Sequence, residues 1–231
     1  MRAIVFGGSG AVGISILTAI AERRDKFQNV TLVLRRKIDN LETLFFPSAP
    51  GDGSYFIQVI VDNFDSQDWM TAKQLQTDFD VAFYALGGKR REVDYDTYRK
   101  IELEYPRSIM AFLKRRNVQE VHYISSFGSS PTSFMSVLRY KYEAEGIISR
   151  AGIKCTFIYR VGGVLTPDKR GMHAFLQVLA RFTDPWHSWS IPSEVLGKAI
   201  VNNCCSGADS REEIELRIIE HDQIIKLGSA N

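Results

Sequence analysis

A glycine-rich segment near the N-terminus of this 231-residue chain has the spacing of a phosphate-binding loop. It reads Gly7-Gly8-Ser9-Gly10-Ala11-Val12-Gly13, which satisfies both G-x-G-x-x-G and G-x-x-G-x-x-G. Such glycines allow a tight turn, and the first amides of a following helix bind the phosphates of a dinucleotide. The alternative is a sharp strand-to-helix turn with no ligand. Because an apolar run precedes the loop and a helical pattern follows it, we favour dinucleotide binding.

The residues after the second apolar run indicate which dinucleotide is bound. NAD sites usually place an acid about 20 residues beyond the loop, where it accepts a hydrogen bond from the ribose. Here Val30–Leu34 is followed by Arg35, Arg36 and Lys37, with no acid between Asp25 and Asp39. A guanidinium binds a 2′-phosphate well, although a solvated basic strand end is the alternative. We therefore predict NADP(H) in preference to NAD(H), with Arg35 and Arg36 on the 2′-phosphate.

Two further strand ends fit a cofactor cleft. Asp62 and Asn63 follow the third apolar run and offer an acceptor to an adenine amine, although a simple loop cap is nearly as good an explanation. The fourth run is followed by Ala85-Leu86-Gly87-Gly88, whose small alanine and glycines let the backbone approach a ribose. Ligands of parallel sheets bind outside the carboxyl ends of the strands, which is where these residues fall.

The alternation of apolar runs with longer amphipathic segments predicts an α/β fold, a doubly wound Rossmann-type parallel sheet. We expect a single domain over residues 1–231, in which about 165–231 form a short C-terminal cap. The predicted strands are Ala3–Phe6, Val30–Leu34, Tyr55–Val61, Val81–Tyr84, Val121–Ile124, Cys155–Tyr159 and an edge strand at Glu213–Glu220. The predicted helices are Gly10–Arg24, Trp69–Thr77, Tyr95–Arg116, Val137–Ala151, Met172–Phe182 and Glu194–Cys204, the last capped by Ser193.

Composition excludes several classes of function. The chain carries 29 Lys and Arg against 27 Asp and Glu, and its basic triplets are dispersed, so we expect no nucleic-acid partner. No apolar stretch approaches the roughly 20 residues of a transmembrane segment, and no signal peptide is recognisable, which predicts a cytoplasmic protein with reduced cysteines. The four histidines lie far apart without metal-ligand spacing, so we predict no metal site.

These motifs, in this order, resemble the short-chain dehydrogenase/reductase superfamily, in particular its atypical branch and the Tat-interactive oxidoreductase-like family. The resemblance rests on GGSGAVG, VTLVLRRK, Ser125-Ser126, Arg160-Val161-Gly162 and the late Ile219–Asp222. It implies a bound nicotinamide dinucleotide, with Arg160, Val161 and Gly162 beside it. It also implies protein partners, because animal members are implicated in transcription, nuclear transport and membrane trafficking. Fungal relatives associate with mitochondria.

The superfamily uses Ser, Tyr and Lys, the last two spaced Tyr-x-x-x-Lys on one helix. The resemblance implies that Ser126 holds a substrate carbonyl and that Lys141 binds the nicotinamide ribose, but Val137 occupies the tyrosine position. Tyr140 and Tyr142 flank Lys141, and helical neighbours point about 100° apart. A backbone-bonded hydroxyl and a solvated lysine are the alternative roles of Ser126 and Lys141. We therefore expect an NADP-dependent oxidoreductase with a degenerate tyrosine or a non-catalytic NADP-sensing regulator.

Overall fold

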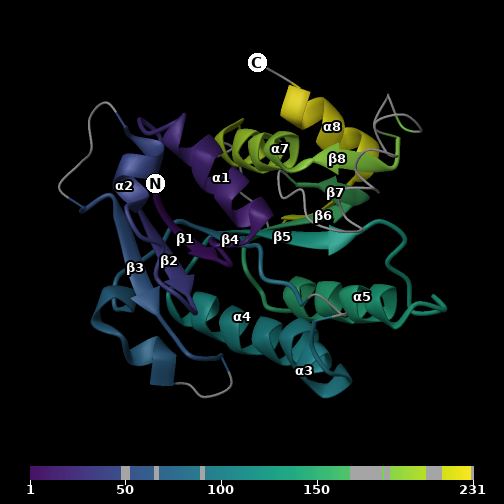
Figure 1. The fold of residues 1–231 in the computed structure, drawn as a ribbon. Coiled ribbons are helices and arrows are strands. Elements are labelled where there is room, and N and C mark those ends of the chain that lie inside the picture. The colour runs from purple at the N-terminus through teal and green to yellow at the C-terminus, as the bar shows by residue number, and fades with distance from the viewer. Residues whose placement is uncertain are drawn as a thin grey trace.

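The computed structural model describes residues 1–47, 53–64, 68–88, 92–166, 184, 188–206 and 215–229. Its main feature is a parallel sheet whose seven strands lie in the order β3-β2-β1-β4-β5-β6-β9 (Figure 1). This order reverses direction at β1, as in the doubly wound dinucleotide-binding folds, so the predicted fold class is confirmed. The strands are β1 (Arg2–Phe6), β2 (Asn29–Leu34), β3 (Phe56–Ile60), β4 (Val81–Tyr84), β5 (Glu120–Ser126), β6 (Cys155–Val161) and β9 (Glu215–Glu220). Two short strands, β7 (Gly163–Leu165) and β8 (Ser190–Pro192), pair separately.

Helices cover both faces of the sheet, and each face has its own apolar core. The helices α1 (Ala11–Ala21), α7 (Ser193–Ser206) and α8 (His221–Ser229) lie on one face, and α4 (Tyr105–Arg115) and α5 (Ser136–Ser149) lie on the other (Figure 1). Successive residues of a strand point to opposite faces, so Ala3 and Val5 pack in the first core, whereas Ile4 and Phe6 pack in the second. This arrangement explains why the strands are continuously apolar.

The C-terminal region does more than cap the strands. β9 pairs with β6 and forms the edge of the sheet, close to the predicted edge strand. α7 packs on α1 at Gly197, where a Cβ atom would lie 2.5 Å from the backbone of Ser15. Ser193 begins α7, but its buried hydroxyl has no hydrogen-bond partner among the described residues, so the predicted side-chain cap is wrong. The predicted helix Met172–Phe182 lies outside the described residues.

Two predicted helices differ in the structure. Trp69–Thr77 forms two 3₁₀ turns, η1 (Asp68–Thr71) and η2 (Lys73–Leu75), because the backbone is extended at Ala72 and the Gln76 amide bonds the Met70 carbonyl. The second is Tyr95–Arg116, in which a π-helical turn, η3 (Lys100–Glu104), separates α3 (Tyr95–Arg99) from α4. Pro106 lies two residues beyond this turn and has no amide hydrogen to continue the α-helical ladder.

The strand register brings the predicted site residues to one edge of the sheet. Phe6 at the end of β1 pairs with Val33 and Tyr84, Tyr84 pairs with Tyr123, and further along Ser126 pairs with Val161. Because all these strands are parallel, the segments that follow them leave the sheet at the same edge. Among the described residues, no helix has both the length and the apolar character needed to cross a bilayer.

Candidate cofactor site at the carboxyl edge of the sheet

The glycine loop joins β1 to α1 and needs glycine at two positions on geometric grounds. Gly7 has φ of +86°, and a Cβ atom there would lie 2.7 Å from the carbonyl carbon of Ala85 at the end of β4. A Cβ atom on Gly13 would lie 2.1 Å from the Gly7 oxygen. The amide of Gly10 donates to that same oxygen at 3.1 Å. The predicted motif therefore forms a closed turn that touches the end of a neighbouring strand.

The start of α1 fits an anion. Gly10 is the N-cap residue and supplies no side-chain cap, and the first turn contains no acidic residue. Ser9, Gly10 and Ala11 are exposed. The first amides of a helix lack partners within the helix and carry its positive dipole end, so they form a site for phosphate oxygens.

The ends of β2 and β3 carry the polar residues that were predicted to contact an adenosine. Arg35 and Arg36 follow β2, are exposed, and form no ion pair with another described residue. A Cβ atom on Gly8 would lie 3.5 Å from the Leu34 side chain, so the glycine loop adjoins the end of β2. Asp62 and Asn63 are exposed beyond the end of β3.

Lys141 lies at the ends of β4 and β5. Its Nζ is 3.0 Å from Glu102 Oε2 and 3.4 Å from both the Tyr123 hydroxyl and the Ile124 carbonyl. A Cβ atom on Gly87 would lie 3.8 Å from the same Nζ. The structure thus brings Lys141 and Gly87, two predicted site residues from distant parts of the sequence, into contact distance of each other.

Glu102 is the residue of this cluster that sequence reasoning missed. It is 2 % exposed, and besides Lys141 it accepts the amide of Gly88 at 2.9 Å through Oε1. No motif marks a single glutamate. The sequence feature that could have indicated an irregular helix at this position is Pro106, which lies four residues after Glu102.

The two serines at the end of β5 have different environments. Ser125 is buried and donates to Glu145 Oε1 at 2.5 Å. Ser126, on the opposite face of the strand, is partly exposed, and its hydroxyl forms no hydrogen bond with another described residue. Of the two hydroxyls, that of Ser126 is the one available to a ligand. Its role in holding a substrate carbonyl stays a prediction.

Arg160 at the end of β6 directs its guanidinium away from the glycine loop. Its Nε and Nη2 bind the two oxygens of Glu145 at 3.0 and 2.7 Å, and its Nη1 lies 3.3 Å from Glu220 Oε1. The hydrogen bonds to Glu145 raise the pKa of Arg160, against the effect of its burial. Val161 is buried, and the Gly162 amide donates to His221 Nδ1 at 3.1 Å. A contact from this segment to a cofactor would therefore involve mainly backbone atoms.

At position 137, where the resemblance predicts a catalytic tyrosine, the chain has a valine. Val137 is partly buried against Tyr98, Leu103 and Tyr140. The Tyr140 hydroxyl bonds that of Tyr95, and burial together with this bond raises the pKa of Tyr140 to about 12. Tyr123 lies near Lys141, but burial and then the charge of Glu102 hold its pKa well above the ordinary value.

A separate polar cluster lies within the first core. His122 Nε2 lies 2.6 Å from Glu120 Oε1, its Nδ1 lies 2.8 Å from the Tyr159 hydroxyl, and Asn203 donates to that hydroxyl at 2.8 Å. The ligand atoms of Glu120, His122 and Cys204 lie within 4.8 Å of one another. Spacing along the sequence did not reveal this potential metal-ligand group. Both ring nitrogens already have protein partners, so the hydrogen-bonding capacity of the ring is met without an ion.

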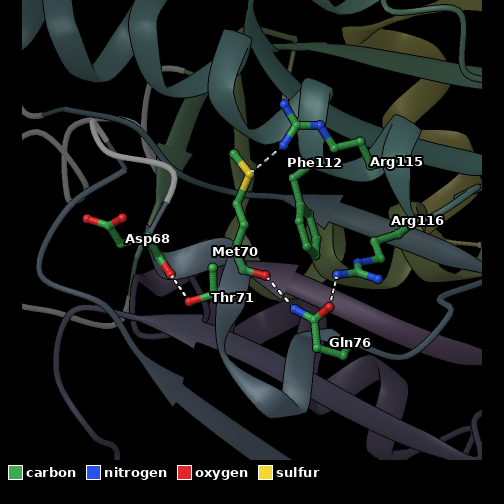
Figure 2. A pocket seen from close by; sticks show the side chains of 7 residues that line it. All are labelled: Asp68, Met70, Thr71, Gln76, Phe112, Arg115 and Arg116. Carbon is green, nitrogen blue, oxygen red and sulfur yellow. Dashed lines mark hydrogen bonds between the residues drawn. The ribbon is translucent and has the colours of Figure 1, made fainter.

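A cavity of about 390 Å³ lies away from this edge, between the 3₁₀ turns and the C-terminal end of α4 (Figure 2). Gln76 donates to the Met70 carbonyl at 2.7 Å and accepts from Arg116 at 2.5 Å, as the dashed lines in Figure 2 show. Arg116 precedes the start of β5 by only four residues, which places this cavity near the amino end of that strand. It is not continuous with the glycine loop, which follows the carboxyl end of β1.

Comparison with models of known protein families finds no match for the chain. Protein HTATIP2 of Rattus norvegicus is 24% identical over 229 residues, which cover 97% of this chain and 88% of the rat protein.

Among solved structures, a UDP-galactose 4-epimerase matches with a TM-score of 0.66 and 14% identity, over 95% of this chain and 76% of the epimerase. A complex of MoeE5 with UDP-glucose and NAD matches with a TM-score of 0.66 and 13% identity, over 99% and 81% of the two chains. A Bacillus halodurans protein provisionally named as an NAD-dependent epimerase/dehydratase has a TM-score of 0.62 and 15% identity, over 99% and 98%. The structural matches agree in fold, and with the rat protein they confirm the resemblance predicted from the motifs.

Proposed function

Because this chain resembles the atypical short-chain dehydrogenases/reductases in sequence and fold, we propose that it is an NADP(H)-binding protein of that type, an oxidoreductase with a degenerate catalytic tyrosine. The observation that carries the proposal is the closed glycine turn between β1 and α1, together with two exposed arginines at the adjacent end of β2 that form no ion pair within the described part of the chain. The full-length similarity to the rat protein supports the assignment.

The glycine loop would hold the pyrophosphate in the middle of the cofactor. The segment Gly7–Gly13, with Ser9, Ala11 and Val12 between its glycines, presents backbone amides rather than side chains to the phosphates. On one side of the loop, Arg35 and Arg36 would bind the 2′-phosphate, and Asp62 or Asn63 would accept from the adenine amine. A carboxylate at the end of β2 would repel that phosphate, and none is present at 35–37.

On the other side of the loop, the ends of β4, β5 and β6 would surround the nicotinamide half. The backbone of Ala85, Leu86 and Gly87 would approach the ribose, Lys141 would donate to its hydroxyls, and Ser126 would orient a substrate carbonyl. Backbone atoms at Val161 and Gly162 would border the ring. When bound, the nicotinamide supplies or accepts a hydride.

The chemistry of this site would be limited by its proton donor. A positioned general acid contributes about 10²–10⁴-fold to such a reaction, and Val137 can neither donate nor accept a proton. Of the phenols near Lys141, Tyr140 is bonded to Tyr95 and Tyr123 is buried with a raised pKa, so each is a weak acid. We therefore expect cofactor binding with slow or absent reduction of simple carbonyls.

The 2′-phosphate role can be tested on the adenosine half alone. Binding of 2′,5′-ADP and 5′-AMP should be compared by calorimetry for the wild type, Arg35→Ala, Arg36→Ala and the control Arg107→Ala, an exposed arginine on α4. We expect wild-type protein to prefer 2′,5′-ADP by about ten- to a hundredfold, the worth of a charged hydrogen bond. At least one of the two site variants should lose this preference, and the control should keep it. Equal affinities throughout would contradict the proposal.

The missing phenol favours a second candidate, a non-catalytic regulator that senses NADP and acts through protein partners. This candidate shares the cofactor site and differs only in turnover. Hydride transfer from bound NADPH, followed at 340 nm against a panel of aldehydes, ketones and enones, separates the two. Oxidation of NADPH that depends on a panel member supports the enzyme, and its absence with intact binding supports the regulator.

The three cysteines are free, as expected for the cytoplasmic location that we also propose.

A further inference from the structure

The buried carboxylate of Glu102 joins two parts of the site that are far apart in sequence. Its Oε2 lies 3.0 Å from Lys141 Nζ on α5, and its Oε1 accepts the Gly88 amide beyond β4. We propose that Glu102 is a positioning residue of the cofactor site, which sets the ammonium of Lys141 and the 86–88 backbone for recognition of the nicotinamide ribose. This inference rests on the proposed function, which places that ribose at Gly87 and Lys141.

The π-helical turn explains how a carboxylate reaches this position. Glu102 and Leu103 are adjacent yet only 2 % and 1 % exposed, and the turn that contains them is wider than an α-helical turn. Pro106 cannot donate to the carbonyl four residues earlier, which is that of Glu102. Such single π turns are rare in proteins and frequent at functional sites. The local backbone thus departs from a regular helix at the residue that contacts Lys141.

Lys141 depends on Glu102 for its orientation. Its other two polar contacts, with the Tyr123 hydroxyl and the Ile124 carbonyl, are both 3.4 Å long, and its ammonium lies 5.3 Å from the Tyr123 ring centre. The Lys141 side chain is 12 % exposed, and a largely buried ammonium that loses its carboxylate partner becomes costly and tends to turn toward water. Removal of the carboxylate would also leave the Gly88 amide without this acceptor. A Cβ atom on Gly88 would lie 2.8 Å from the Tyr98 ring, so the segment passes close to that side chain.

The ammonium is the part of this pair that a ligand would contact. Glu102 is 2 % exposed, and its two oxygens already bind Lys141 and the Gly88 amide. An ammonium only donates hydrogen bonds, and each ribose hydroxyl can accept one, so a vicinal diol beside Gly87 would accept from the Lys141 ammonium that Glu102 holds in place. The ligand class that this arrangement fits is therefore a ribose diol, and Glu102 affects only the half of the dinucleotide that carries the nicotinamide.

The experiment compares two ligands that share the adenosine half. NADPH and 2′,5′-ADP are titrated into wild type, Glu102→Gln and the control Glu104→Gln, a more exposed carboxylate on the same π turn. The glutamine keeps an oxygen for Gly88 and removes the charge opposite Lys141. We expect Glu102→Gln to weaken NADPH binding at least about tenfold and to leave 2′,5′-ADP within twofold, while Glu104→Gln changes neither.

A double-mutant cycle identifies the route. If Glu102 acts through Lys141, then Glu102→Gln in a Lys141→Met background should add less than twofold to the loss of NADPH affinity. Because the double variant has lost both charges of the pair, it should fold even if Glu102→Gln alone folds poorly. The NADPH affinities of Lys141→Met and of the double variant can then still be compared.

Three results would overturn the inference alone: unchanged NADPH affinity in Glu102→Gln, an equal loss for both ligands, or additive effects in the cycle. Failure of the wild type to bind either ligand would instead overturn the proposed function, and the inference with it.

Discussion

Gly7 and Gly10 belong to the same loop, but the folded chain requires only one of them. At Gly7, φ of +86° and the 2.7 Å approach to Ala85 both oppose a side chain. We expect Gly7→Ala to lower the free energy of unfolding by about 1–3 kcal/mol or more, measured by urea denaturation.

Gly10→Ala is the matched comparison for this prediction. Gly10 has φ of −77°, and a Cβ atom there meets only the Gly7 oxygen, at 3.5 Å. Alanine is a poorer N-cap than glycine, so its cost should stay near 1 kcal/mol or below. If the protein proposed here binds a pyrophosphate at this loop, Gly10→Ala should weaken NADPH binding while the fold persists. Equal stability of Gly7→Ala and wild type would show that the loop geometry is wrong.

Val137 is the residue that decides catalytic competence in the proposed site. It is partly buried beside Tyr98, Leu103 and Tyr140, so its exposed side leaves room for the ring of a larger side chain. We expect Val137→Tyr to raise NADPH-dependent carbonyl reduction, up to the 10²–10⁴-fold that a general acid supplies. Val137→Phe fills the same space without the hydroxyl and should stay at the wild-type rate. An equal gain in both variants would mean that packing, and not proton donation, limits turnover.

At the scale of elements, the sequence predicted best what depends on local pattern. β4 has the predicted bounds, Val81–Tyr84, because a strand buried on both faces is continuously apolar. The interruption of Tyr95–Arg116 was visible as Pro106, but the inward turn of Glu102 was not. Its partners lie 14 and 39 residues away in sequence, and only the packing of α5 and of the segment after β4 against the π turn brings them together. The same limit applies to Glu145 and Arg160, whose pairing reflects tertiary contact alone.

The β7–β8 pair depends on one buried acid. Asp184 accepts from the amide and hydroxyl of Ser188, the amide of Trp189, and the amide and hydroxyl of Ser190, at 2.5–3.0 Å. Burial alone would raise the pKa of Asp184, but these hydrogen bonds outweigh it and hold the pKa below the ordinary 3.8. A carboxyl whose pKa is lower in the folded than in the unfolded state stabilises the fold at pH values above its unfolded-state pKa. That contribution is lost as the pH falls from the unfolded-state pKa through the folded-state pKa.

We therefore expect Asp184→Asn to destabilise the protein at pH 7 by about 1–3 kcal/mol, since an amide cannot accept all five bonds. The gap between variant and wild type should narrow as the pH falls below about 4, because the unfolded wild-type chain then binds a proton at Asp184 while the folded carboxylate is still ionised. Denaturant titrations at pH 7 and pH 3 measure both effects. A gap that is the same at both values would mean that charge plays no part in holding this loop.

For the whole molecule, the strand order determines where a ligand can bind. The connection from β1 runs to β2 on one side and, later, from β3 across to β4 on the other, so the switch in strand order lies at β1, and ligands of such sheets bind at the carboxyl end of this point. The glycine loop lies at this point, with Arg35 on one side of it and Lys141 on the other. A dinucleotide has the same order of parts: adenosine, pyrophosphate, then nicotinamide ribose. The order of the site residues along the sheet edge therefore matches the order of the parts of the ligand.

Calorimetric titration of the full chain with NADPH and with NADH tests this claim most directly. Both dinucleotides should bind with one-to-one stoichiometry. NADPH should bind about ten- to a hundredfold more tightly, because Arg35 and Arg36 contact a phosphate that NADH lacks. Absence of binding by either dinucleotide would contradict the cofactor site itself. Equal affinities would contradict the role given to the two arginines.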